Sequence, residues 1–339
     1  MKKLLIAVAL LITSHAVSAQ KDLPDYGKID KADLLLKECE FDKDAEAYKL
    51  LDYGDVRYIR GRNVFKIETK RRIRIKILKD KGLDAANIKI KFYSKLNYEN
   101  ITDVSGVTYN IDAAGNVVTT KLDKSSVFKK PVDNKISEVA FTMPDVKVGS
   151  VIEYRFTDDK ESYEDLDDWY FQDDIPTRMS VYRILVPSIF RFVNELLVYQ
   201  KAEQLHDEVH ESVSLENGRI LSYTSVEKTY ILRNVTALRD EPYMGASKDY
   251  LQRVIFQLSQ IVYGDGEVDE VRSTWPKLTE SLLGSDEFGV QMRKNIPHTR
   301  SLDDSLKLLK DDNKKVEFIY NYVQRNMNWN GKERIYSYD

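Results

Sequence analysis

Hydrophobic residues between about Val64 and Val235 repeat at every second position, which is typical of half-buried strands. The clearest run extends from Phe65 to Ile77, where isoleucines alternate with lysines and arginines. No helical pattern interrupts this part of the chain, so we predict antiparallel sheets packed as a β-sandwich. One hairpin turn is expected at Asn217-Gly218. The other strand candidates are 88–92, 107–111 with a turn at 112–116 into 117–118, 151–156, 179–186, 190–199, 219–226 and 229–235.

The hydrophobic pattern changes after Pro242. Residues 248–262 are apolar but fit a strand and a helix equally well, whereas the period is helical from Thr274 onward. A second helix is expected to begin at 301–304, and a third runs from Lys314 into a Trp329-Asn-Gly corner. The predicted fold class is therefore α+β: an antiparallel β-sandwich followed by a short helical carboxy-terminal segment. The helix after Thr274 is expected to bury Trp275, Leu278, Leu282 and Leu283.

The first 19 residues have the pattern of an export signal. Lys2 and Lys3 precede an apolar run at 4–12, and Val17-Ser-Ala19 fits the small-residue pattern at a cleavage site. The run is well short of the roughly 20 residues that a membrane span needs. We expect a protein exported to the periplasm or the cell surface, with no transmembrane anchor after signal cleavage.

The composition indicates which partners to expect and what must stabilise the fold. Removing Lys2 and Lys3 moves the formal charge from -3 to about -5, a mild acidity that gives no reason to expect nucleic acid. Cys39 is the only cysteine, so no internal disulfide can form and packing must supply the stability. We interpret Cys39 as a small buried or half-buried residue.

Two stretches carry a family resemblance: Lys76-Ile-Leu-Lys-Asp-Lys-Gly82 and Met143-Pro-Asp-Val-Lys-Val-Gly-Ser-Val-Ile-Glu-Tyr154, the second followed by Trp169-Tyr-Phe-Gln172. Over roughly residues 40–260 the chain resembles the domain of unknown function 3857 family, the amino-terminal β-rich partner of exported bacterial transglutaminase-like proteins. Residues 275–329 resemble the first helices of the attached domain. With the predicted signal peptide at 1–19, the resemblance implies a β-sandwich-like module at 20–262 and the helical start of an incomplete transglutaminase-like domain at 263–339.

Transglutaminase-like proteins perform acyl transfer or amide hydrolysis with a cysteine, a histidine and an aspartate. In such proteins the cysteine follows soon after a tryptophan corner like that at Trp329. Here no cysteine follows Trp329 before Asp339, and His298 precedes the helix. The resemblance therefore transfers no catalytic residue, cofactor or metal site, and we expect this chain not to be an enzyme as it stands.

Two functional hypotheses follow from this resemblance. The first is an exported, non-catalytic β-sandwich module that binds or positions a partner or substrate for a transglutaminase-like domain. The alternative is a fragment of a cysteine hydrolase or transferase whose catalytic half is missing. The expected partner is a cell-envelope protein or a glycan. Its candidate surface is Trp169, Tyr170 and Phe171 in the acidic stretch 158–174, although a preferable interpretation places Trp169 and Phe171 in the core.

Two further groups of residues have both a chemical and a structural interpretation. His206 and His210 have the spacing of a zinc-binding helix, but Asp207 stands where a metalloprotease has glutamate. We favour a polar strand or loop whose histidines face water. Glu153 lies among apolar residues with Arg155 on the same face, and we predict a structural ion pair across the sheet.

Overall fold

The computed structural model describes residues 23–60, 65–214, 220–239, 241–263, 266–272, 274–294 and 299–328. The chain divides into two compact units, residues 1–271 and 272–339. The predicted signal at 1–19, the Asn217-Gly218 turn, His298 and Trp329 lie outside the described residues.

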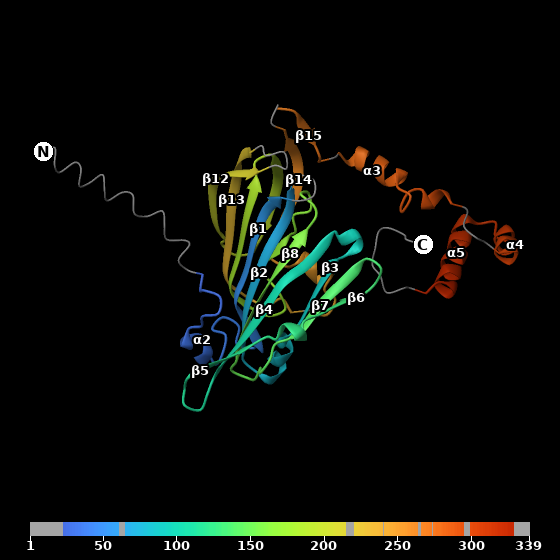
Figure 1. The fold of residues 1–339 in the computed structure, drawn as a ribbon. Coiled ribbons are helices and arrows are strands. Elements are labelled where there is room, and N and C mark those ends of the chain that lie inside the picture. Colours follow the sequence, from blue (N-terminus) through green and yellow to red (C-terminus); the bar gives the residue numbers. More distant parts are fainter. Residues whose placement is uncertain are drawn as a thin grey trace. The chain divides into compact units, whose positions relative to one another are not determined.

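Eight strands form the main sheet of the first unit (Figure 1). Neighbouring strands are antiparallel except β1 and β10, which run parallel. A parallel pair needs a long crossover, and here residues 61–176 lie between the two strands in sequence. In spatial order the strands are β12 (Glu203–Ser214), β13 (Ile220–Val235), β10 (Thr177–Pro187), β1 (Ala47–Arg60), β2 (Phe65–Ile77), β8 (Val151–Lys160), β4 (Glu99–Ile111) and β5 (Val117–Lys121).

Two smaller sheets pack on one face of the main sheet. Odd-numbered residues of β2 point to that face: Phe65 and Ile67 join the core against one small sheet, and Ile73 and Ile75 join the core against the other. This arrangement confirms the predicted α+β fold with a β-sandwich. One small sheet contains β3 (Asn87–Tyr93), β7 (Ile136–Thr142) and β6 (Phe128–Pro131), and the other contains β11 (Phe190–Leu197), β14 (Arg253–Val262), β15 (Val268–Glu270) and β9 (Trp169–Tyr170).

The opposite face of the main sheet is covered by the amino-terminal segment, which contains α2 (Lys31–Leu35). Leu34 and Cys39 pack there against Tyr109 and Val151. Cys39 is fully buried, as its size and chemistry predicted, and burial raises the pKa of its thiol. Among the described residues the 3₁₀ helices are η2 (Asp80–Ala86), η3 (Lys95–Asn97), η4 (Lys124–Ser126), η5 (Ser247–Asp249) and η6 (Gln291–Arg293).

The described residues of the second unit form three α-helices, α3 (Trp275–Gly284), α4 (Arg300–Leu308) and α5 (Asp312–Asn326). Thr274 is the N-cap residue of α3, as predicted. The N-cap of α4 is Thr299, whose hydroxyl accepts from the amide of Leu302, rather than a residue within 301–304. The expected buried side of α3 is wrong, because none of the three helices buries a residue.

Several predicted strands have different limits in the structure. The two candidates at 219–226 and 229–235 form the single strand β13, and the ambiguous stretch 248–262 contains β14. The central strand β1 and the small-sheet strand β7 had no predicted counterpart. No helix in the described part of the chain is long and apolar enough to cross a membrane.

Candidate binding groove

A groove of about 660 Å³ lies over the main sheet, within the first unit. Its floor consists of Ile73 and Ile75 from β2 and Tyr154 and Phe156 from β8. The alternation of β2 places both isoleucines on the same face, which explains why the floor is apolar. One wall is β3 over 88–91, and another is the segment 173–175 that leads into β10.

One end of the groove is closed by a close approach between η2 and the beginning of β1. A Cβ atom at Gly82 would lie only 2.1 Å from the carbonyl oxygen of Glu46, so only glycine fits there. The amides of Leu78 and Lys79 donate to the same carbonyl oxygen. The Lys81-Gly82 turn of the first family-like stretch therefore shapes the groove.

Four charged side chains form a connected network at the 173–175 wall. The ammonium of buried Lys49 contacts Asp52 at 3.1 Å and Asp173 at 2.6 Å. Asp52, which is 2% exposed, also pairs with the Arg71 guanidinium at 3.2 Å. The guanidinium in turn lies 4.6 Å from the centre of the Trp169 ring. The network joins β1, β2 and the 173–175 segment.

The network holds its four groups in their charged forms. Burial favours the neutral form of Asp52, but the adjacent Arg71 and Lys49 outweigh it and lower the pKa of Asp52. Burial likewise opposes the charge on Lys49, yet the carboxylates of Asp52 and Asp173 give a net rise in the pKa of Lys49. A protonated lysine is no nucleophile. The arrangement therefore fixes charge and position rather than activating a reactive group.

The three aromatic residues proposed as a partner surface differ in their exposure to solvent. Trp169 and Phe171 are 4% and 1% exposed, which places them in the core. The Trp169 ring stacks on Tyr182 with centroids 4.7 Å apart, and its indole N–H donates to Ser180. Only Tyr170 is partly exposed, beside Arg253. Neither Trp169 nor Phe171 presents a surface to a partner.

His206 and His210 lie on β12, where both side chains are exposed. The helical zinc hypothesis is therefore wrong, and the interpretation as a polar strand is confirmed. Residues four apart on a strand are separated by about 13 Å, too far to share one zinc ion. The described residues contain no group of three or more histidine, cysteine, aspartate or glutamate side chains that could hold a metal.

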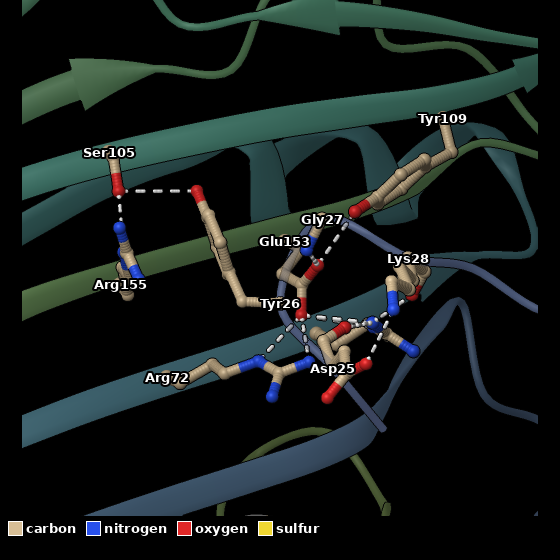
Figure 2. A network of polar contacts seen from close by, with 10 residues as sticks. Asp25, Tyr26, Gly27, Lys28, Arg72, Ser105, Tyr109, Glu153 and Arg155 are labelled. Atoms are coloured by element: carbon tan, nitrogen blue, oxygen red, sulfur yellow. Dashed lines mark hydrogen bonds and ion pairs between the residues drawn. The ribbon is translucent and has the colours of Figure 1, made fainter. Parts of the chain in front are cut away.

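Glu153 forms a buried ion pair, but not with Arg155. Its carboxylate accepts from Arg72 at 2.7 Å and from Arg74 at 3.0 Å, both on the adjacent strand β2. Figure 2 shows that the Tyr109 hydroxyl and the Gly27 amide also reach this carboxylate. The site anchors the amino-terminal segment to the main sheet.

Arg155 lies apart from this ion pair. It donates to Ser105 and covers the Tyr26 ring (Figure 2). Residues two apart on a strand share a face but are separated by about 7 Å along the strand, whereas Arg74 lies directly opposite Glu153 across the ladder. The prediction of an ion pair across the sheet was right, and its partner was wrong.

The family comparison matches the region that contains the floor of the groove. Residues 65–219 match the family model of DUF3857, a domain of unknown function with a solved structure. The suspected family is thus confirmed. The DUF3857 region includes β2, β3, β8 and the 173–175 wall, whereas Lys49 and Asp52 precede it.

The fold also has a counterpart among solved structures. A crystal structure of a presumed protease from Parabacteroides distasonis matches with a TM-score of 0.53 and 14% identity, over 83% of this chain and 50% of that protein. The chain therefore spans half the length of that protein, and the similarity shows the fold alone. An arginine-bound mutant of a two-domain M1 zinc metallopeptidase matches with a TM-score of 0.24 and 9% identity, over 55% of this chain and 42% of that one. No curated protein matches the chain.

Sequence inspection missed the charged network, although one signal for it was present. Lys49 and Asp52 flank two leucines in the run Lys49-Leu-Leu-Asp52, and all four residues are buried. Charged residues inside an apolar run indicate buried pairing. Their partners Arg71 and Asp173 could not be identified in the same way, since Asp173 is 124 positions from Lys49.

Proposed function

We propose that this chain is a non-catalytic module of an exported protein, which binds a polypeptide partner or substrate in the groove and positions it for a transglutaminase-like domain. The observation that carries the proposal is the groove itself. Its 660 Å³ is within the size range of ligand-binding clefts, and an apolar floor with a few fixed polar groups is their usual lining.

The charged lining supports a polypeptide over a uniformly charged ligand. Lys49, Arg71 and three further lysines line the groove together with four carboxylates, so both signs of charge are present. The pairing of Lys49 and Arg71 with Asp52 and Asp173 fixes the shape of one wall without an excess of charge. A nucleic acid or polyphosphate ligand would instead favour a basic surface.

The test is selection from a random eight-residue peptide phage library against the full chain. We expect enrichment on the unmodified protein and loss of enrichment on Ile175→Arg, which places a long charged side chain at the groove wall. Val193→Arg, on β11 and outside the groove lining, serves as the matched control and should select the same peptides. Equal enrichment on Ile175→Arg, or no enrichment on the unmodified protein, would contradict the proposal.

A second proposal is favoured by the fold shared with the presumed protease, of which this chain spans half. According to this second proposal, the chain belongs to a longer cysteine hydrolase or transferase of the transglutaminase-like family, whose reactive cysteine, histidine and aspartate lie elsewhere. The coding DNA beyond Asp339 decides this. An in-frame helix that begins with cysteine, followed by strands bearing histidine and aspartate, is the expected result, and unrelated sequence contradicts it.

A further inference from the structure

We propose that the groove binds an extended polypeptide as an added strand on β3, with apolar and acidic residues alternating along it. This inference rests on the proposed function and names the class of polypeptide. It follows from three properties of β3: its open edge, its position in the groove wall, and the side chains that an added strand would meet.

The edge of β3 that faces away from β7 is open. β3 is a terminal strand of its sheet and pairs only with β7 among the described strands. The amide of Met143 donates to the carbonyl of Ala86, next to the last register pair, Asn87 with Thr142. Hydrogen-bonded and non-hydrogen-bonded pairs alternate in an antiparallel ladder. The main-chain groups of Lys89 and Lys91 therefore point away from β7.

One hydrogen bond at the end of β3 confirms this direction. The amide of Tyr93, two positions beyond Lys91, donates to the Glu99 carboxylate at 2.6 Å rather than to β7. The corresponding groups of Lys89 and Lys91 have no partner on the described neighbouring strands. These groups lie at the groove wall, because the four successive residues 88–91 all line the groove. An extended chain in the groove can hydrogen-bond to them, which is the basis of strand addition.

The two faces of β3 set the side chains that its neighbour would need. Ile88 joins the core above the main sheet and Ile90 packs against that core, whereas the side chains of Lys89 and Lys91 are exposed. Side chains opposite each other on adjacent strands interact directly, and opposite charges are favourable. A strand beside β3 therefore needs apolar residues over the floor and acidic residues beside the lysines.

The same lysines disfavour a second copy of this chain as the occupant. Two β3 edges in antiparallel register would bring like charges together at Lys89 and Lys91, which is unfavourable. At the other edge of this sheet, β6 carries Lys129, Lys130 and Pro131, residues that commonly protect an edge. β3 instead borders a groove with an apolar floor.

The experiment measures binding of a fluorescent, end-capped eight-residue peptide in which valine alternates with glutamate, by anisotropy with the full chain. We expect saturable binding that weakens about tenfold in Lys89→Glu/Lys91→Glu, and a gain for the matched valine–lysine peptide in that variant. Two further peptides carry N-methyl groups on alternate backbone amides, at the odd-numbered positions in one peptide and at the even-numbered positions in the other. A strand paired on one side should lose binding with one set and keep it with the other.

The outcomes separate this inference from the proposed function. Equal binding of both N-methylated peptides, with binding still abolished by Ile175→Arg, overturns strand addition and leaves the groove as the binding site. If the valine–glutamate peptide does not bind while library peptides bind the groove, the proposed alternation of apolar and acidic residues in the bound polypeptide is overturned. Unchanged binding in Ile175→Arg contradicts both proposals. The inference is also overturned if the protein forms a dimer that cannot bind the peptide and if Lys91→Pro dissociates that dimer. In that case the edge of β3 binds a second copy of the chain.

Discussion

At the scale of single residues, the buried charges on the amino-terminal face of the main sheet are held in two ways. Glu153 is fully buried between Arg72 and Arg74, so its charge is compensated. Lys76 is equally buried, but its ammonium donates to the carbonyl oxygens of Leu34 and Gly149, each at 2.6 Å. Carbonyl oxygens satisfy the donors without cancelling the charge, and burial lowers the pKa of Lys76 to about 8.

The lowered pKa of Lys76 predicts a rise in stability at alkaline pH. Between about pH 8 and 10.5 the unfolded chain binds a proton at Lys76 that the folded chain does not, so the free energy of unfolding increases with pH. Urea unfolding at about pH 7.5 and 10 should show this increase in the unmodified protein and not in Lys76→Met. Lys79→Met, which removes an exposed ammonium, should retain it. Identical pH dependence in unmodified protein and Lys76→Met would contradict the assignment.

Replacing the Glu153 carboxylate should be costly because it leaves the buried guanidinium of Arg74 and the half-buried guanidinium of Arg72 without a counter-charge. We expect Glu153→Gln to lower the free energy of unfolding by about 3 kcal/mol, the usual effect of breaking a buried ion pair. Urea unfolding measures the change. Glu195→Gln on β11 is the control, since that glutamate is exposed, and it should change stability by less than about 0.5 kcal/mol. Similar losses in both variants would show that the anchoring of residues 25–28 contributes little.

At the scale of elements, alternation identified the strands that have one polar face. Phe65–Ile77 was predicted as a strand with the limits that β2 has in the structure. β1 escaped detection because its first half is covered on both faces: residues 47–52 are all buried, so the period of two is lost. The groove could not be predicted either, since it depends on the order of strands in space, which a single sequence does not contain.

Gly54 is the residue of β1 over which the Trp169 ring packs. A Cβ atom there would lie 2.5 Å from Cζ3 of Trp169 and 3.1 Å from the Tyr182 ring. The Trp169 ring is held by its stacking and by Ser180, so it cannot move away without loss of contacts. We expect Gly54→Ala to cost about 2 kcal/mol, measured by thermal unfolding and near-ultraviolet circular dichroism. Gly245→Ala, where the nearest atom is 3.5 Å away, should behave like the unmodified protein, and equal stability of both variants would contradict this packing.

At the scale of the whole molecule, the two units differ in how they are stabilised. The first unit has apolar cores on both faces of its main sheet, together with the buried charges of Glu153, Lys76 and Lys49. In the second unit, α3, α4 and α5 contain no buried residue, although each has an amphipathic sequence. Short helices without tertiary packing are marginally stable in water. Residues 65–219, which match the DUF3857 model, lie entirely in the first unit.

This contrast predicts that the two units exchange amide hydrogens at different rates. Amides of β2 and β8 lie between neighbouring strands and should be protected up to the free energy of global unfolding, whereas those of α3–α5 should exchange by local opening. Hydrogen–deuterium exchange with mass spectrometry measures both in one experiment. Brief trypsin treatment should likewise remove the helices and leave a folded fragment that ends near Arg272. Protection of α5 equal to that of β2 would show that the helices have a packing partner, and the apolar stripe with Val316, Ile319 and Val323 would be the place to locate it.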